Sequence, residues 1–203
     1  MARLTYFFAL FYALSAVCAS TSNSTDAVPL PAYQINTELD LSFEQDMRDT
    51  HLIYDYDAQD SEGNPEKWRY ELWFFSDKSV VYAIHGGPMA GRYNYQTAAY
   101  QCVRAGEIWQ ISWLEETGTT VSLVYDITKG TINGLLNFSK GHWNYPVLAH
   151  GDKRNQTDFD RWRGLAKIGT QVERYMLVER AYILESFKGK GELLPIDPDV
   201  ATF

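Results

Sequence analysis

A chain of 203 residues is long enough for one domain with a sizeable core. Its formal charge of −8 at pH 7, without a basic stripe, argues against binding to nucleic-acid phosphates, and any anionic small molecule would need a local cation to bind. Aromatic residues make up 15% of the chain, and most lie in short alternating runs, which indicates a β-rich fold whose interior is lined by aromatic side chains.

The first 19 residues have the pattern of a secretory signal peptide. Arg3 precedes an apolar run from Tyr6 to Val17, and small residues follow at the expected cleavage position. A retained anchor is the alternative, but the polar stretch from Ser20 to Asp26 follows at once, and no other stretch has the length to cross a bilayer. We therefore predict a secreted or secretory-pathway protein with no membrane contact in its mature form.

Loss of that peptide would remove Cys18 and leave Cys102 alone, which is more often a small buried hydrophobe than a nucleophile. Asn23, Asn137 and Asn155 begin Asn-X-Ser/Thr triplets, which are glycan acceptors in a secreted protein but also arise by chance. Residues 20–48 predict a flexible leader, with a short helical or irregular segment from Leu41 to Arg48 that packs on the domain.

The domain proper is expected over residues 49–190. Its first strand starts at His51 and places Leu52, Tyr54 and Tyr56 on one inward face. The alternative is that both tyrosines fill the core and their hydroxyls reach the surface. After a polar turn over residues 59–66, a second strand is predicted from Trp68 to Phe75.

A third strand from Val80 to Ile84 leads into a bend from His85 to Arg92 that contains three glycines and a proline. The bend is not a phosphate loop, because no Gly-Lys-Ser/Thr follows it. Arg92 leaves the bend as either an exposed cation or an inward clamp for an anion.

A hairpin is predicted from strands at Ala98–Val103 and Ile108–Glu115. In the second strand Trp109, Ile111 and Trp113 share one parity, and Glu115 continues it. Desolvation on an apolar face favours the protonated form of a carboxyl group, so Glu115 is a candidate proton donor. Alternatively, the strand ends at Leu114 and Glu115 is a solvated residue of the following turn.

Two further strands are expected at Thr120–Tyr125 and Thr131–Phe138, and their near-regular spacing predicts an all-β, antiparallel, up-and-down barrel with a few short helices. Asn155 to Lys167 predicts a short amphipathic helix outside the barrel or across one mouth. Tyr175 to Phe187 is either a closing strand or a helix, and residues 191–203 form an irregular tail.

Several pieces of this sequence together resemble the phenolic acid decarboxylases. The similarity is dense from His51 to Leu123, and Tyr175 to Ile183 resembles the family's last strand. The five pieces are His51-x-Ile53-Tyr54-x-Tyr56, Trp68-x-Tyr70-Glu71, Tyr82-x-Ile84-His85-x-Gly87 leading to Ala90-Gly91-Arg92, Ser112-Trp113-x-Glu115, and Thr117-Gly118-Thr119-x-Val121-Ser122-Leu123.

The resemblance implies a lipocalin-like (calycin) barrel, a homodimer, and cofactor-independent decarboxylation of 4-hydroxycinnamic acids such as p-coumaric, ferulic and caffeic acid to 4-vinylphenols. It also implies site residues, which carry over by position: Tyr54, Tyr56, Tyr70, Arg92 and Glu115.

We expect Glu115 to be the acid, Tyr54 and Tyr56 to bind the phenolic oxygen, and Arg92 with Tyr70 to orient the carboxylate. The reverse orientation uses the same residues. Further substrate-binding residues are expected at Tyr82, Ile84 and Trp113.

The chain departs from the family pattern in places. The family commonly has proline after the acid, where this chain has Glu116. The segment from Asn137 to Pro146 also matches the family poorly, and because this segment is expected to shape one end of the cavity, the resemblance does not identify the substrate. Two other functions therefore remain. One is another lyase, cyclase or isomerase acting on a larger phenolic metabolite in the same barrel. The other is a secreted, non-catalytic, lipocalin-type binder of aromatic acids, which fold alone cannot separate from an enzyme.

Overall fold

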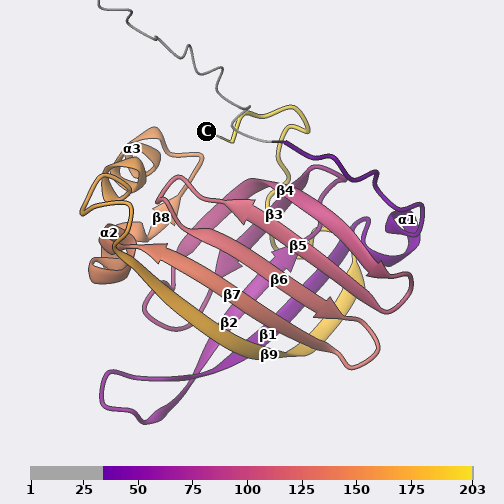
Figure 1. Ribbon diagram of the computed structural model, residues 1–203, viewed down its shortest axis with the longest axis horizontal. Helices are drawn as coiled ribbons and strands as arrows, with labels where there is room; N and C mark the ends of the chain where they lie inside the picture. The colour runs from indigo at the N-terminus through magenta and orange to yellow at the C-terminus, as the bar shows by residue number, and fades with distance from the viewer. Residues whose placement is uncertain (1–33, 203) are drawn as a thin grey trace, which may run out of the picture. The chain divides into compact units, whose positions relative to one another are not determined.

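The computed structural model describes residues 34–202 (Figure 1). The predicted signal peptide, Cys18 and the Asn23 triplet lie outside these residues. The elements in chain order are α1 (Phe43–Asp46), β1 (Thr50–Gln59), β2 (Pro65–Trp73), β3 (Ser79–Ile84), β4 (Arg92–Arg104), β5 (Ile108–Leu114), β6 (Thr120–Asp126), β7 (Thr131–Ser139), α2 (Lys140–Asn144), the 3₁₀ helix η1 (Pro146–Ala149), β8 (Gly151–Asp152), α3 (Gln156–Leu165) and β9 (Arg174–Lys188).

The strands close into an antiparallel barrel, which confirms the predicted fold. The sheet runs in the order β3-β2-β1-β9-β7-β6-β5-β4, and pairing between β3 and β4 closes the ring. The two-residue strand β8 pairs in parallel with the start of β4. Because β9 returns to pair with both β1 and β7, the segment that could have been a strand or a helix is the closing strand (Figure 1).

Side chains alternate between the inside and the outside of the barrel. In β5, Trp109, Ile111 and Trp113 are buried, whereas Gln110 and Ser112 on the other face are partly exposed. The same inward face continues across neighbouring strands through antiparallel register. Polar side chains inside this apolar interior are therefore exceptions that need an explanation.

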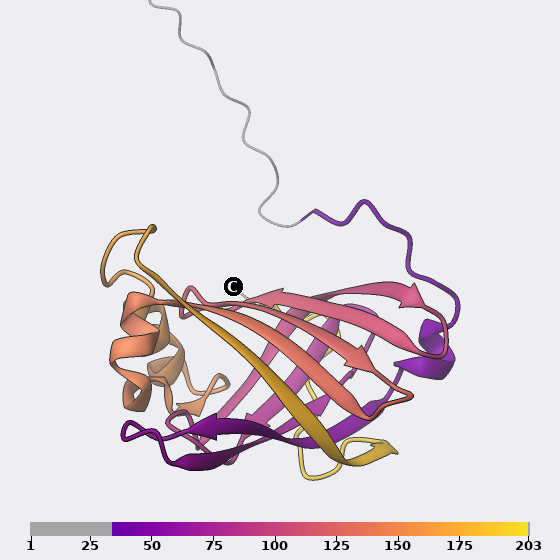
Figure 2. The ribbon, with the colours of Figure 1, turned by 60° about the horizontal axis from the view of Figure 1, so that its bottom comes forward.

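Helices lie at the two ends of the barrel (Figure 2). At one end α1 inserts Phe43 against the rings of Tyr100 and Trp109, at centroid distances of 4.9 and 6.0 Å. At the other end lie α2, η1 and α3. The predicted helix is therefore confirmed, and of its two expected positions it takes the one at a barrel mouth. No helix in the described part of the chain is long and apolar enough to cross a membrane.

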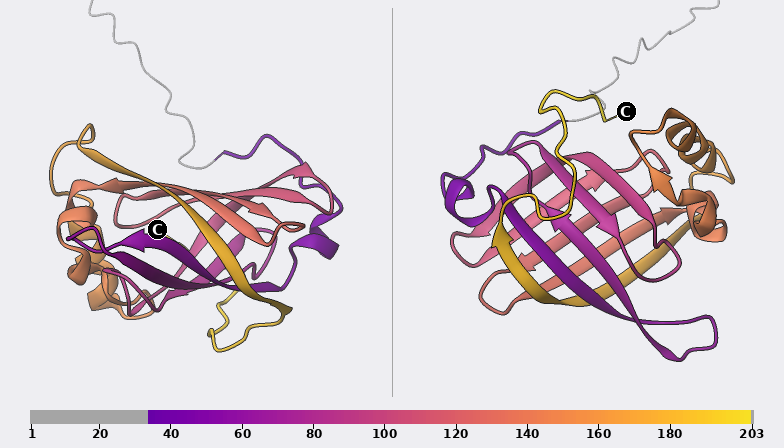
Figure 3. Two further views of the ribbon diagram at one scale, coloured as in Figure 1. Left: turned by 90° about the horizontal axis from the view of Figure 1, so that it is seen from below. Right: turned by 180° about the vertical axis from the view of Figure 1, so that it is seen from behind.

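The residues after β9 cross the outside of the barrel (Figure 3). Leu193 packs there in an apolar cluster with Trp73, Val81, Ala83 and Tyr95, whose side chains point outward from β2, β3 and β4. Strand β4 is longer than the sequence pattern predicted, because it begins at Arg92 rather than at Ala98. That extension turns Arg92 from a loop residue into the first residue of a strand.

Candidate active site

The barrel interior contains a cavity with about 450 Å³ of empty space, including the part that opens to solvent. The structure brings all eight residues expected from the sequence to the wall of this cavity: Glu115, Arg92, Tyr54, Tyr56, Tyr70, Tyr82, Trp113 and Ile84.

Three tyrosines pack against one another in the cavity wall. Tyr54 and Tyr56 project from β1, and Tyr70 projects from the opposite position on β2. The ring centroids of Tyr54 and Tyr56 are 5.4 Å apart, and Tyr70 lies 5.9 and 5.2 Å from them. Burial raises the pKa of each of these phenols above its ordinary value. Their hydroxyls therefore stay protonated near neutral pH and can donate hydrogen bonds.

Glu115 lies just past the end of β5 and still points into the cavity. The strand ends at Leu114, and residues 115–118 form a turn in which the Gly118 N–H donates to the Glu115 carbonyl at 2.8 Å. Gly118 has a φ of +80°, which glycine adopts without strain. The solvated-turn alternative was therefore right about the turn and wrong about exposure, since Glu115 is only 8% exposed.

The Glu115 carboxylate accepts four hydrogen bonds. The Tyr82 hydroxyl donates to Oε1 at 2.5 Å, and Trp113 Nε1 donates to the same oxygen at 3.2 Å. Oε2 accepts from Arg92 Nη2 at 3.2 Å and from Thr117 Oγ1 at 3.3 Å. Burial and the Glu115 charge raise the pKa of Tyr82 well above its ordinary value, so Tyr82 remains a donor.

Arg92 is held on several sides and is only 1% exposed. Its Nη1 donates to the Ala149 carbonyl at 3.0 Å, and Nη2 donates to Glu116 at 2.6 Å as well as to Glu115. The guanidinium lies 3.8 Å from the ring centroid of Trp162 on α3, a cation–π contact. Burial lowers the pKa of Arg92, but the neighbouring acidic groups raise it more, so Arg92 stays charged.

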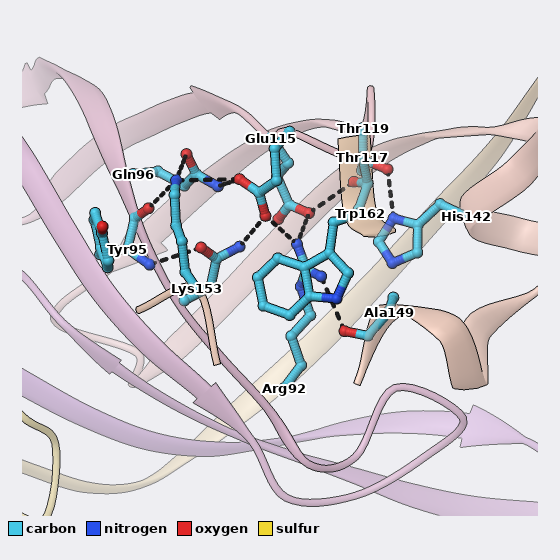
Figure 4. Close-up of polar contacts among 12 residues, drawn as sticks. Arg92, Tyr95, Gln96, Glu115, Thr117, Thr119, His142, Ala149, Lys153 and Trp162 are labelled. Carbon is cyan, nitrogen blue, oxygen red and sulfur yellow. Dashed lines mark hydrogen bonds and ion pairs between the residues drawn. The ribbon is translucent and has the colours of Figure 1, made fainter. Parts of the chain in front are cut away.

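Glu116 brings a second carboxylate into the site, and it forms a buried ion pair with Lys153 at 3.1 Å. The side chains of both residues are 1% exposed. Glu116 also accepts from the Asn94 amide at 2.8 Å and from the Gln96 amide at 2.6 Å (Figure 4). Lys153 donates to the Thr202 carbonyl at 2.9 Å. This pair therefore connects β4, the turn after β5 and the C-terminal tail.

The pair is charged. Burial raises the pKa of Glu116, but Arg92 and Lys153 lower it more, so the net pKa lies below the ordinary value. Burial lowers the pKa of Lys153, and Glu116 opposes that effect. Each member of the pair thus depends on the other for its charge.

His142 on α2 also lines the cavity. Its Nδ1 lies 2.7 Å from Thr119 Oγ1, and its backbone N–H donates to the Ser139 side chain that caps α2. Burial and the positive charge of Arg92 lower the pKa of His142 well below its ordinary value. His142 is therefore neutral near pH 7.

A groove at the mouth of the barrel shares Tyr70, Met89 and Phe138 with the cavity wall, so the groove and the cavity adjoin through these side chains. Glu179 of β9 lies in this groove, and burial raises its pKa to about 7. The negative charge of Glu179 raises the pKa of Tyr56, in the same direction as the larger effect of burial. A carboxyl group with such a pKa beside phenols is suited to accept a proton near neutral pH.

Sequence reasoning missed Glu116, Lys153, His142 and Glu179. The parity of β4 could have placed Asn94 and Gln96 beside Arg92, but the predicted strand began too late to include them. In residues 34–202, no group of three or more His, Cys, Asp or Glu residues is placed to hold a metal ion.

A closed antiparallel barrel with a tyrosine-lined interior and a buried acid–arginine pair defines a β-barrel protein with an interior small-molecule site. Residues 45–158 match the family model of the phenolic acid decarboxylases (PAD). The chain belongs to the phenolic acid decarboxylase family.

Two curated proteins resemble it. Phenolic acid decarboxylase PadC of Bacillus subtilis (strain 168) is 31% identical over 100 residues, which cover 49% of this chain and 56% of that protein. A Vibrio cholerae protein named "Probable phenolic acid decarboxylase" is 28% identical over 89 residues, which cover 44% of this chain and 47% of that protein. The chain spans about half the length of the curated relatives it matches.

Proposed function

We propose that this protein decarboxylates 4-hydroxycinnamic acids, among them p-coumaric, ferulic and caffeic acid, to 4-vinylphenols. The observation that carries the proposal is the buried Glu115 carboxyl group, which contacts Arg92 and Tyr82 in the same cavity as the Tyr54, Tyr56 and Tyr70 phenols. An acid, a cation for a carboxylate and a group of phenolic donors are the parts that this reaction requires.

The chemistry follows from the electrons of the para-hydroxyl group. Glu115 would protonate the alkene carbon that carries the carboxylate while the phenol loses its proton, and the product of this step is a quinone methide. The bond to the carboxylate carbon then breaks, CO2 leaves, and its electron pair restores the aromatic ring as a phenolate. The phenolate takes back a proton, so the reaction needs no oxidant or reductant.

The charges in the cavity support Glu115 as the proton donor. Glu115 and Glu116 face two cations, Arg92 and Lys153, so the cluster is balanced before a ligand enters. A bound substrate carboxylate adds a third negative charge. In this proposal one proton is taken up with the substrate to offset that charge, and Glu115, which lines the cavity, transfers it to the alkene.

The test of this function is incubation of the protein with p-coumaric, ferulic and caffeic acid while vinylphenols and CO2 are measured. Formation of both products supports the proposal. A different product from a larger phenolic compound would support the rival lyase, cyclase or isomerase. Saturable binding without any product would instead identify a lipocalin-type binder.

We expect that 4-methoxycinnamic acid is not decarboxylated at a measurable rate. Methylation of the para-oxygen blocks loss of the phenolic proton, so the quinone methide cannot form. The measurement compares vinyl-product formation from 4-methoxycinnamic and p-coumaric acid at equal concentration. Similar rates for the two compounds would refute the quinone-methide route.

We propose Glu179 as the group that accepts the phenolic proton, because it lies in the groove at the cavity mouth with a pKa raised to about 7 by burial. A base acts in its ionised form, so kcat/KM should rise as the pH increases through about 7. In Glu179→Gln this rise should disappear and the rate should fall about 10²-fold or more.

The matched control is Glu185→Gln, which changes an exposed glutamate on the same strand and should leave the pH profile unchanged. An unaltered rise through neutral pH in Glu179→Gln would remove Glu179 from the mechanism.

A further inference from the structure

Two polar atoms in the cavity wall have no hydrogen-bond partner. Among the described residues, Arg92 Nε and His142 Nε2 are buried side-chain nitrogens without a partner, and both residues line the cavity. The third such nitrogen, His51 Nε2, lies 2.8 Å from a Glu71 oxygen and outside the cavity. An unsatisfied buried donor is costly, and each such atom in a folded protein calls for an explanation.

Nε is the guanidinium nitrogen of Arg92 that has no hydrogen-bond partner. Ala149 occupies Nη1, the two glutamates occupy Nη2, and Trp162 covers a face of the guanidinium. The Glu116–Lys153 pair holds this arrangement in place. Arg92 therefore cannot turn another edge to the cavity without breaking these contacts.

His142 is also fixed in orientation. Ser139 caps the helix that carries it, and Thr119 Oγ1 lies 2.7 Å from Nδ1. The ring is neutral, because burial and Arg92 lower the pKa of His142. In a neutral ring one nitrogen donates and the other accepts, and a donor role toward a ligand requires the tautomer in which the Thr119 hydroxyl donates to Nδ1 and the proton is on Nε2.

We propose that Arg92 Nε and His142 Nε2–H together form the seat for the substrate carboxylate, and that His142 is a specificity-determining residue for ligands with a free carboxylate. This proposal rests on the proposed function and names the group that binds one end of its substrate. The charged donor supplies most of the attraction, and the neutral donor fixes the direction of the second oxygen.

The position of His142 also allows contact with a ligand. Its helix α2 lies at one end of the barrel (Figure 2), and its side chain lines the same cavity as Arg92.

The test compares two ligands that cannot react. 3-(4-Hydroxyphenyl)propanoic acid has the phenol and the carboxylate but no alkene, and 4-ethylphenol lacks the carboxylate. Their dissociation constants are measured by calorimetry. The unaltered protein should prefer the acid. In His142→Phe the affinity for the acid should fall about ten- to a hundred-fold, as expected for a lost hydrogen bond to a charged group, and that for 4-ethylphenol should change less than about two-fold.

A second variant separates ligand binding from a structural role. His142→Gln keeps an amide donor and should recover part of the affinity for the acid, which loss of packing alone would not allow. His51→Gln changes a buried histidine outside the cavity and should leave both affinities unaltered.

Equal losses for both ligands in the His142 variants, or no loss for the acid, would overturn the seat. Because neither ligand reacts, the result is independent of turnover. A protein that prefers the acid but forms no vinylphenol would contradict the proposed function and leave the seat intact.

Discussion

We expect Glu115→Gln to lower kcat for p-coumaric and ferulic acid by about 10²- to 10⁴-fold, the range for loss of a general acid. Glutamine has nearly the same shape, so the side chain can remain among Tyr82, Trp113 and Arg92. It has no acidic proton to give to the alkene. The measurement is the rate of vinylphenol formation, followed by absorbance and by chromatography.

Two controls show that the loss is chemical. The variant should unfold at a temperature close to that of the unaltered protein, and it should still bind 3-(4-hydroxyphenyl)propanoic acid. Glu107→Gln, at the far end of the hairpin between β4 and β5, should retain full activity because Glu107 faces Arg104 on the surface. A Glu115→Gln variant that keeps its activity would remove Glu115 from the mechanism.

The site residues that the sequence could predict lie on strands, where every second side chain points to the same face. Tyr54 and Tyr56 lie two residues apart on β1, and Trp109, Ile111 and Trp113 do the same on β5. In each strand the inward face follows from the apolar pattern and needs no knowledge of other segments. The resemblance to a family then assigned roles to residues that the pattern had already placed inside.

The same rule fails at the residue after Glu115. Strand alternation would point Glu116 outward if Glu115 points inward, yet both are buried. The reason is that β5 ends at Leu114. In the following turn, which Gly118 completes, successive side chains no longer alternate between the two faces of the sheet. A local pattern therefore predicted one carboxylate of this site and would have excluded the other.

The other site residues that the sequence did not predict lie far along the chain from the residues they contact. Lys153 reaches Glu116 from a segment with no periodic pattern, and His142 reaches the cavity from a five-residue helix. Neither position carries a signal in its own neighbourhood. Their partners are set by how the segment between β7 and β9 folds over the barrel end, which depends on tertiary packing.

Removal of one member of the Glu116–Lys153 pair should strongly destabilise the protein. We expect Lys153→Met to lower the free energy of unfolding by about 3–5 kcal/mol, because it leaves the buried carboxylates of Glu115 and Glu116 to share the charge of Arg92. Glu116→Leu should have a cost of the same order, since Lys153 is then left beside Arg92. The free energies are obtained from urea unfolding at pH 7.

The double variant Glu116→Leu with Lys153→Met should cost less than the sum of the two single changes, because no uncompensated charge remains at this position. The matched control is Lys67→Met, which removes the lysine of an exposed pair with Asp57 and should change stability by less than about 1 kcal/mol. A Lys153→Met variant as stable as this control would show that the buried pair does not hold the site together.

The stability of the two single variants should change with pH in opposite directions. In Glu116→Leu, burial and Arg92 both lower the pKa of Lys153, without the opposing effect of Glu116. The unfolded chain then binds more protons than the folded one, so the stability of this variant should rise as the pH increases toward the ordinary lysine value. Lys153→Met should show the opposite trend, because its excess buried charge is negative and protonation relieves it at low pH. Parallel profiles for the two variants would mean that packing, and not charge, accounts for their instability.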